Sequence, residues 1–479
     1  MSGKQPASIE WREAVGSGGT YGNRGNDEQR SRTMSESKEG STRREFLETV
    51  GAIGAVGAVG AMVASCSEGM GEQYENYQWP PLRESAPDGP TLRAGLIGCG
   101  GRGTGAAIDY LEAGPNLEIV ALADYFQDRL DSCRARLSEE KDVEIPDERC
   151  FVGFEAYLQL LETDVDLVLM ATPPYFRPEH FEACVDARKH VFMEKPVAVD
   201  PVGARSVMAS ARTADGLGLC VVTGTQRRHQ ADYLATFREV TRGVIGEVVG
   251  ANCYWNGVVP WWRGRQRGWS DVEYMLRDWV NWTWLSGDHI VEQHVHNLDV
   301  VNWFLGDAHP EKAVGIGARW RRPSGDQYDC FSIDFTYEND VHVHSMCRQI
   351  AGCANNISEL VRGTKGYSNC ENRIWRANGT LAWEYPYEQD EQGERIGPRP
   401  YKQEHIDLVT AIRTNQRVNE AERTAIATLT AIMGRISCYT GQEVTWDEMM
   451  ESNLKLGPDR LELGPSELVR GVIPVPGTA

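Results

Sequence analysis

The chain has 479 residues, of which 41% are hydrophobic and 25% charged, which is ordinary for a globular protein and long enough for two or three domains. Its 49 basic and 69 acidic residues give a net charge of −20. No nucleic-acid partner is therefore expected, because no basic excess exists to neutralise phosphates. The 12 cysteines form no C-x-x-C pair, which argues against a zinc ribbon or a thioredoxin-like site and leaves disulfides open.

The N-terminal residues predict an export signal. Residues 1–33 are polar and lack periodicity, which predicts disorder or an upstream start-site artefact, since Met34 begins a sensible signal by itself. Residues 42–47, TRREFL, match a twin-arginine signal, and a Gly/Ala-rich apolar stretch follows at 50–63. That stretch is shorter than the roughly 20 residues needed to span a bilayer.

Residues 63–66, VASC, resemble a lipobox, in which Cys66 would be lipidated after cleavage. Ordinary cleavage and an uncleaved anchor stay open as alternatives. Residues 67–90 are polar and contain prolines, which predicts a tether. The expected location is the periplasm, with membrane attachment through Cys66.

Residues 92–105, LRAGLIGCGGRGTG, predict a short apolar strand that runs into a glycine-rich turn. Gly98, Gly100 and Gly103 fall on the G-x-G-x-x-G spacing of a dinucleotide-binding turn, which needs a tight turn, a close backbone approach to a pyrophosphate and close helix packing. The pyrophosphate would lie at the N-terminus of the following helix. A glycine-rich surface turn is the alternative.

A second apolar strand at 117–123 ends at Asp124, about 20 residues beyond the glycines, where an acidic side chain would bind the ribose hydroxyls. A carboxylate there would repel a 2′-phosphate, so NAD is expected rather than NADP. Arg102 and Arg129 are nearby bases that weaken this preference.

Further strands are expected at 166–171, 190–196 and 217–223, with helices at 103–114, 125–137, 178–188 and 201–214. The strand at 166–171 ends in Thr172-Pro-Pro, and the next ends in Glu194-Lys195-Pro196. A lysine at the carboxyl end of a parallel strand projects toward the ligand crevice, although a solvated surface lysine is the alternative. Gln226 and Arg228 follow the last strand near the same crevice. The pattern predicts a doubly wound parallel sheet.

Beyond about residue 243 the chain predicts a second domain. A weakly alternating strand at 247–255 is followed by a Trp-rich stretch that includes Trp262, whose indoles suit stacking on sugar rings or filling of a core. Glu292 and His296 are four residues apart and would share one helix face, with His294 pointing elsewhere. No H-E-x-x-H pattern occurs, so no metal is expected.

The remainder predicts an open, mainly antiparallel sheet and closing helices. Strands are expected at 313–321, 328–337, 340–349, 358–363 and 366–372, and helices at 298–304, 405–413 and 421–440. Residues 374–400 are expected to be loop and edge structure. The predicted organisation is a signal and tether (1–90), a Rossmann domain (91–228), an α+β substrate and oligomerisation domain (229–449) and a tail of unassigned role (450–479).

The order of GCGGRG, a strand-end Asp, TPP, EKP and a later acid-x-x-x-His resembles the Gfo/Idh/MocA family of oxidoreductases over about residues 92–449. The resemblance implies that His296 is the catalytic histidine and Glu292 the carboxylate before it, where the family more often has Asp. A homo-oligomer formed through the open sheet is also expected, although the sequence does not specify which side of the sheet faces a partner. The residues expected to bind the nucleotide are Gly98, Gly100, Gly101, Arg102, Gly103, Asp124, Thr172, Glu194 and Lys195.

The expected activity is hydride transfer between a nicotinamide cofactor and a sugar, glycoside or polyol. His296 would take the hydroxyl proton, and Lys195 would orient the substrate oxygen and stabilise its developing charge. Gln226, Arg228 and Trp262 are the expected substrate contacts. Two rivals stay open: NAD-dependent cleavage of a glycoside without net redox change, and a non-catalytic sugar-binding lipoprotein.

Overall fold

The computed structural model describes residues 82–392, 396–397 and 399–478. The predicted twin-arginine signal, the apolar stretch after it and Cys66 lie outside the described residues. Within them, no helix has the length and hydropathy needed to cross a bilayer. The 11 cysteines in the described part of the chain are all free thiols.

A six-stranded parallel sheet is built from residues 92–223 in the order β3-β2-β1-β4-β5-β6. Its strands are β1 (Leu92–Ile97), β2 (Leu117–Asp124), β3 (Cys150–Val152), β4 (Leu167–Met170), β5 (His190–Met193) and β6 (Val221–Thr223). The helices between them are α2 (Gly101–Leu111), α3 (Gln127–Lys141), α4 (Ala156–Leu161), α5 (Arg177–Asp186) and α6 (Pro201–Leu217).

This order confirms the predicted doubly wound sheet. All four residues of β4, LVLM, are buried, as expected for a strand covered on both faces. The chain reverses its direction of travel across the sheet between β1 and β4, so the ligand crevice is expected at the carboxyl ends of these two strands.

The second sheet has nine strands in the order β14-β13-β12-β11-β7-β10-β9-β8-β15. Its strands are β7 (Val248–Gly257), β8 (Lys312–Ala318), β9 (Cys330–Tyr337), β10 (Val341–Gln349), β11 (Asn356–Gly363), β12 (Gly366–Ser368), β13 (Arg373–Arg376), β14 (Leu381–Glu384) and β15 (Val444–Thr445). Pairing is antiparallel except between β7 and β10, which confirms the mainly antiparallel prediction.

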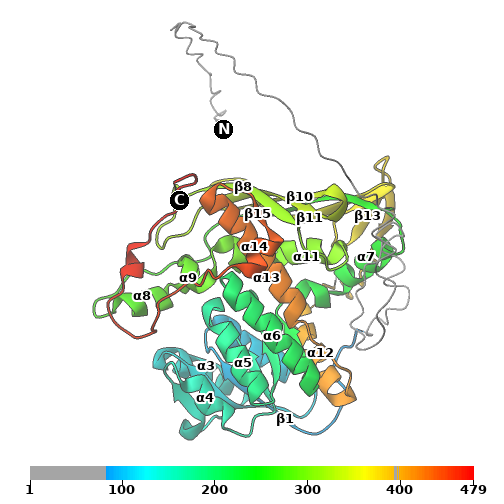
Figure 1. The fold of residues 1–479 in the computed structure, drawn as a ribbon. Helices are drawn as coiled ribbons and strands as arrows, with labels where there is room; N and C mark the ends of the chain where they lie inside the picture. Colours follow the sequence, from blue (N-terminus) through cyan, green and yellow to red (C-terminus); the bar gives the residue numbers. More distant parts are fainter. Residues whose placement is uncertain (1–81, 393–395, 398, 479) are drawn as a thin grey trace, which may run out of the picture. The chain divides into compact units, whose positions relative to one another are not determined.

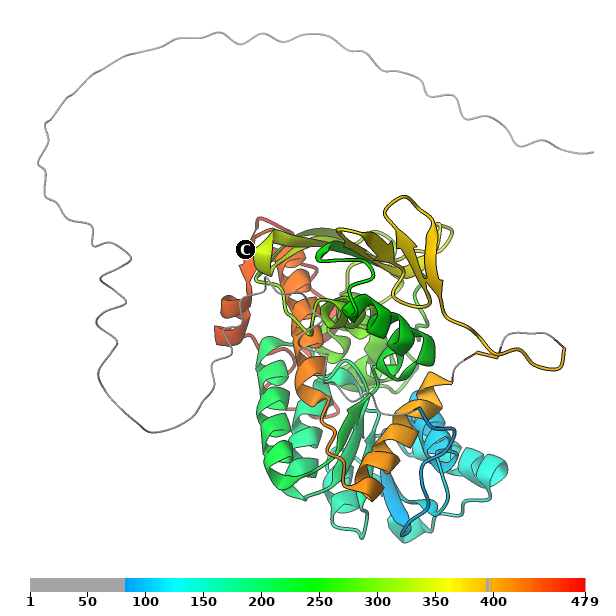
Figure 2. The same cartoon turned by 90° about the vertical axis from the view of Figure 1, so that its right-hand side faces the viewer.

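The remaining helices of the described residues are α7 (Ala231–Thr241), α8 (Asp271–Arg277), α9 (Thr283–Ser286), α10 (His289–Glu292), α11 (Val295–Phe304), α12 (Pro400–Thr414), α13 (Ala421–Thr440) and α14 (Trp446–Glu451). Helices α11 and α13 pack on one face of the second sheet, and α13 also packs on α6. Figure 1 shows α13 between the two sheets, beside α6 and below β8. Figure 2 shows α12 lying instead against the first sheet, where it packs on α2 and β6.

Two terminal segments differ from expectation. The last residues of the predicted tether are packed rather than free: Ala86 is buried, and its N–H donates to the Ala113 carbonyl at 2.7 Å. The C-terminal tail, residues 452–478, lies back across the molecule; Leu456 N–H donates to Asp200 Oδ2 at 2.8 Å, and Gly477 N–H to the Thr440 carbonyl at 3.0 Å.

Candidate active site

The glycine turn between β1 and α2 brings three segments of backbone together. Gly98 has φ +96°, and a Cβ there would lie 2.7 Å from the backbone N of Thr172. A Cβ on Gly103 would overlap the Gly98 carbonyl oxygen, so α2 can approach β1 only with glycine at this position. Around Gly100 and Gly101, by contrast, no atom of the described residues outside the turn's own backbone lies within 4 Å of a built Cβ. The turn therefore leaves open space above two glycines at the start of a helix, which is the space a pyrophosphate needs.

A cavity of about 330 Å³ opens above this turn. Of the nine residues expected to bind the nucleotide, seven line the cavity and Glu194 and Lys195 do not. The opposite wall comes from the segment between β7 and α10, which sequence reasoning did not assign to the nucleotide. Its lining residues there are Trp261, Arg263, Leu276, Arg277 and Trp279.

Asp124 stands at the end of β2 and lines the cavity. Its Oδ2 accepts the Cys99 N–H at 2.7 Å, and its Oδ1 accepts the Phe126 N–H at 2.9 Å. Burial raises the pKa of this carboxyl, and the two backbone N–H groups oppose that shift. Each oxygen keeps a second lone pair, so the carboxylate can still accept from ribose hydroxyls.

Glu194 braces the turn rather than lining the cavity. Its Oε1 accepts from Arg102 Nε at 2.5 Å, and Arg102 also pairs with the buried Glu404 at 3.4 Å. Arg177 joins the two predicted strand-end turns, because it donates to the Thr172 carbonyl at 2.8 Å and to the Pro196 carbonyl at 2.5 Å. The carboxyl ends of β4 and β5 are thereby held together.

Lys195 follows β5 and reaches residues of the second sheet's helical layer. Its Nζ donates to the Glu292 carbonyl oxygen at 2.5 Å and lies 3.3 Å from Glu292 Oε1. Both side chains are mostly buried, with exposed fractions of 12% and 13%. The structure therefore brings together a lysine and a carboxylate that are 97 residues apart in the chain.

The prediction that Glu292 and His296 share one helix is wrong. Helix α10 ends at Glu292 and α11 begins at Val295. The start of α10 is fixed by Asp288, which has φ +73°, accepts the His289 N–H through Oδ1 and accepts the distant Tyr328 N–H through Oδ2 at 3.0 Å. The interruption is fixed by His294, whose Nε2 contacts Ser345 Oγ on β10 at 2.8 Å. Tertiary hydrogen bonds at both points override the helical spacing.

His296 lies at the start of α11 with 8% of its surface exposed. Its ring stacks near Trp255 of β7, with centroids 5.8 Å apart. Burial holds the pKa of His296 well below its usual value, and the positive charges of Lys195 and Arg227 act in the same direction. The imidazole is therefore neutral at physiological pH and able to accept a proton.

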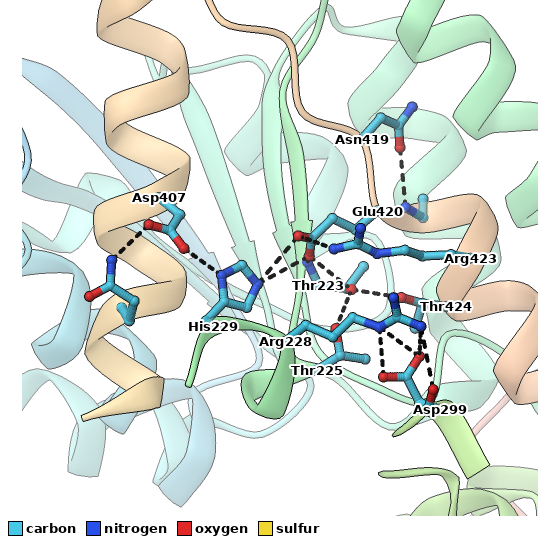
Figure 3. A network of polar contacts seen from close by, with 12 residues as sticks. Thr223, Thr225, Arg228, His229, Asp299, Asp407, Asn419, Glu420, Arg423 and Thr424 are labelled. Atoms are coloured by element: carbon cyan, nitrogen blue, oxygen red, sulfur yellow. Dashed lines mark hydrogen bonds and ion pairs between the residues drawn. The ribbon is translucent and has the colours of Figure 1, made fainter. Parts of the chain in front are cut away.

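The three residues expected to contact the substrate differ in their burial and in their partners. Gln226 begins the short helical turn η3 (Gln226–His229), and its buried Oε1 has no hydrogen-bond partner in the part of the chain that the structure describes. Arg228 is unavailable, because its guanidinium is buried against Asp299 at 2.8 Å (Figure 3). Trp262 is 57% exposed and does not line the cavity, whereas its neighbour Trp261 does.

Arg227 is the residue that sequence reasoning missed beside His296. Its guanidinium lies 5.9 Å from the Trp255 ring centroid and pairs with the buried Glu359. Neighbouring arginines in a short helical turn point in different directions, and nothing in the sequence distinguishes Arg227 from Arg228.

The histidines that crowd together in sequence have separate partners. The His289 ring packs edge-on against Phe331, whereas His294 bonds to Ser345. Within the described residues no group of three or more His, Cys, Asp or Glu side chains is arranged to hold a metal ion.

Two family models match the chain. Residues 92–222 match the GFO_IDH_MocA model, described as an oxidoreductase family with an NAD-binding Rossmann fold. Residues 238–427 match the C-terminal alpha/beta domain of the same oxidoreductase family. The two matches together cover both sheets except β15 and the last residue of β6, and leave the C-terminal tail outside.

Curated relatives and solved structures share the fold. Scyllo-inositol 2-dehydrogenase (NADP(+)) IolW of Bacillus subtilis is 24% identical over 251 residues, 52% of this chain and 60% of that protein, so the chain covers less than two thirds of its length. A glycosyl hydrolase family 109 protein of Streptomyces coelicolor is 36% identical over 113 residues, 23% of each chain. The crystal structure of scyllo-inositol dehydrogenase from Lactobacillus casei with NAD(H) and scyllo-inositol matches with TM-score 0.55 and 19% identity, over 74% of this chain and 99% of that one.

Proposed function

The chain belongs to the Gfo/Idh/MocA oxidoreductase family, and from this premise we propose that it transfers a hydride between a nicotinamide nucleotide and a hydroxyl-bearing carbon of a sugar, glycoside or polyol. One observation carries the proposal: Lys195 Nζ lies 3.3 Å from Glu292 Oε1, so that a strand-end lysine of the first sheet meets the helices that carry His296. Lys195 follows β5, which pairs with β4, and Thr172, two residues beyond the end of β4, lines the cavity above the glycine turn.

The cavity fits a dinucleotide, because open space lies above Gly100 and Gly101 at the N-terminus of α2. When bound, the nicotinamide accepts or returns the hydride. We propose NAD rather than NADP, since the Asp124 carboxylate lines the cavity and would repel a 2′-phosphate. Identification of the nucleotide released from the purified protein tests this preference.

Three side chains share the acid–base work in this proposal. His296, neutral because of burial and neighbouring positive charge, accepts the proton of the substrate hydroxyl as hydride leaves the same carbon. The Lys195 ammonium donates to the substrate oxygen and stabilises its negative charge. Glu292 holds that ammonium in place through its carbonyl and carboxylate oxygens.

Substitution of either proposed catalytic residue tests the assignment. Lys195→Ala and His296→Ala should each lower kcat by about 10²–10⁴-fold, the usual contribution of a positioned acid or base. NADH affinity should change little, because neither side chain lines the nucleotide cavity. Substrates are screened among monosaccharides, glycosides and polyols by formation of reduced cofactor. Full activity in both variants would refute these roles.

Cleavage of a glycoside without net redox change is a second candidate, favoured by the matched segment of the family 109 glycosyl hydrolase. The same histidine and lysine would serve a transient oxidation followed by elimination. Product formation with a catalytic amount of NAD and no accumulation of NADH would identify this reaction.

Export is part of the proposal as well. The twin-arginine pattern at residues 42–47 directs folded proteins outward, and an extracytoplasmic compartment supplies no nicotinamide nucleotide. The nucleotide would therefore be loaded before export and travel bound. Fractionation of cells that express the full chain, with and without Arg43→Lys and Arg44→Lys, tests this route.

A further inference from the structure

The wall of the cavity opposite the glycine turn comes from outside the six-stranded sheet. We call this wall the roof; it comprises Trp261, Arg263, Leu276, Arg277 and Trp279. The roof belongs to residues 258–288, which connect β7 to α10. A nucleotide bound above the glycine turn would therefore lie between two parts of the chain more than 150 residues apart.

The roof is fastened to the edge of the first sheet by one of its arginines. Phe126 is the second residue after β2, and the centroid of its ring lies 3.9 Å from the guanidinium carbon of Arg277. The same guanidinium makes two 3.1 Å hydrogen bonds to the Asp128 carboxylate in the first turn of α3. These contacts close the cavity on its β2 side.

The C-terminal tail holds the roof from behind. The Val272 N–H on α8 donates to the Gly464 carbonyl at 3.1 Å, and the Ser466 N–H donates to Asp271 Oδ2 at 2.9 Å. Behind them a third apolar core joins roof, tail and first sheet. Its members include Phe176, Leu276, Trp282 and Trp284, with Leu456, Leu461, Leu468 and Val469 of the tail packed against it.

The other end of the tail is fixed to the first sheet. Leu456 N–H donates to Asp200, which caps the N-terminus of α6. The next residue, Gly457, has φ +99° and lies so close to Tyr175 that a Cβ would overlap its ring. The tail thus bridges the first sheet and the roof, and both of its attachments are tight.

The charge of the roof suits a dinucleotide. Neither Arg263 nor Arg129, which faces the same cavity, forms an ion pair within the described residues. Burial lowers the pKa of Arg263, and the charges of Arg129 and Arg277 lower it further. A pyrophosphate brings two negative charges, which would relieve this repulsion.

We propose that the tail holds the roof closed over a bound dinucleotide and makes that nucleotide a resident group of the protein, which rests on the function proposed above. Release of the nucleotide then requires the roof to lift, and lifting requires the tail to part from α8 or from the first sheet. Trp261 and Arg263 are assigned as nucleotide contacts that no strand-end motif reveals.

The test measures dissociation of NADH from the full-length protein and needs no substrate. Protein loaded with NADH is mixed with excess NAD, and the loss of NADH fluorescence is followed. Gly457→Ala, which drives a methyl into Tyr175, should raise the dissociation rate at least about tenfold, equivalent to about 1.4 kcal/mol. Gly464→Ala is the matched control, because nothing lies within 4 Å of its built Cβ, and it should leave the rate unchanged.

A second pair tests the roof without disturbing the tail. Trp261→Ala should speed dissociation, whereas Trp262→Ala, at an exposed neighbouring position, should not. If NADH dissociates slowly from the wild type and at the same rate from Gly457→Ala and Trp261→Ala, the roof does not retain the nucleotide. The proposed function would still stand. Wild-type protein that releases NADH within the mixing time would also overturn residence. Wild-type protein that binds no nicotinamide nucleotide would overturn both.

Discussion

His229 is a charged histidine inside the protein. Its Nδ1 lies 2.6 Å from Asp407 of α12 and its Nε2 lies 3.3 Å from Glu420, which precedes α13 (Figure 3). Burial alone would lower its pKa, but the two carboxylates raise it to about 10. The imidazolium therefore ties the turn after β6 to both closing helices at neutral pH.

This charge predicts a pH dependence of stability. The folded-state pKa lies above the unfolded value of about 6.5, so the contribution is complete below pH 6.5 and is lost as pH rises through 10. His229→Gln should lower the free energy of unfolding at pH 7 by about 1–3 kcal/mol, because Asp407 and Glu420 lose a charged partner, although Glu420 keeps its ion pair with Arg423. The difference from wild type should shrink between pH 7 and 10 in urea unfolding.

His342 offers the matched control. It also pairs with an aspartate, Asp334, at 2.8 Å, but half of each side chain is exposed. His342→Gln should cost less than about 1 kcal/mol, since solvent screens the pair. Equal effects of the two substitutions would contradict a buried imidazolium at His229.

The location of a single residue could be predicted where the backbone alone sets the direction of its side chain. Lys195 and Asp124 come directly after parallel strands, and strand ends of one sheet meet at one edge. Arg228 was expected at the substrate, but its guanidinium is buried against Asp299. Arg227 and Arg228 lie in a short helical turn, where neighbouring side chains diverge. Elements far away in sequence decide whether an arginine of this turn pairs with Asp299 or lies beside Trp255.

At the scale of an element, the turn from β1 into α2 depends on contact between two backbones. Gly103→Ala should destabilise the protein by about 2 kcal/mol or more and abolish NADH binding, because the new methyl overlaps the Gly98 carbonyl. Gly105→Ala on the same helix meets only an Arg102 nitrogen at 3.8 Å and should be neutral or stabilising by about 0.5–1 kcal/mol. Urea unfolding and NADH titration distinguish the two, and similar behaviour would refute the close packing.

Elements that a local sequence pattern encodes could be predicted, whereas features fixed by contacts between distant residues could not. Buried runs such as β4, and the apolar stripe of α13 with Gly441 at its end, follow from sequence periodicity. The separation of α10 from α11 follows from the contacts of Asp288 and His294 with other elements. No local pattern encodes such contacts, and the same holds for the tail.

At the scale of the whole molecule, the second sheet has a face that no helix of the described residues covers (Figure 1). A continuous row across that face runs through Ile316, Ser332, Met346, Tyr254 and Ser358, each paired with the next. Ile316 is 76% exposed and Val314 beside it on β8 is 50% exposed. We propose that this face joins copies of the chain.

Ile316→Lys should lower the molar mass of the protein in solution, measured by light scattering after size exclusion, because it buries a charge in the proposed interface. Val472→Lys serves as control, since Val472 is 87% exposed but lies in the tail, away from the sheet. If the wild-type protein is oligomeric and the Ile316→Lys protein has the same molar mass, this face is not the interface between copies.

The tail also sets an order of events during synthesis. Residues 452–478 leave the ribosome after every strand of both sheets. If the tail holds the roof as proposed above, the chain can take up the nucleotide before the tail docks, and docking of the tail then retains it. A premature stop after α14 should yield a protein that still has both sheets but loses its bound nicotinamide nucleotide on dilution. A folding assay would not detect this loss, whereas a spectrum of the bound nucleotide would.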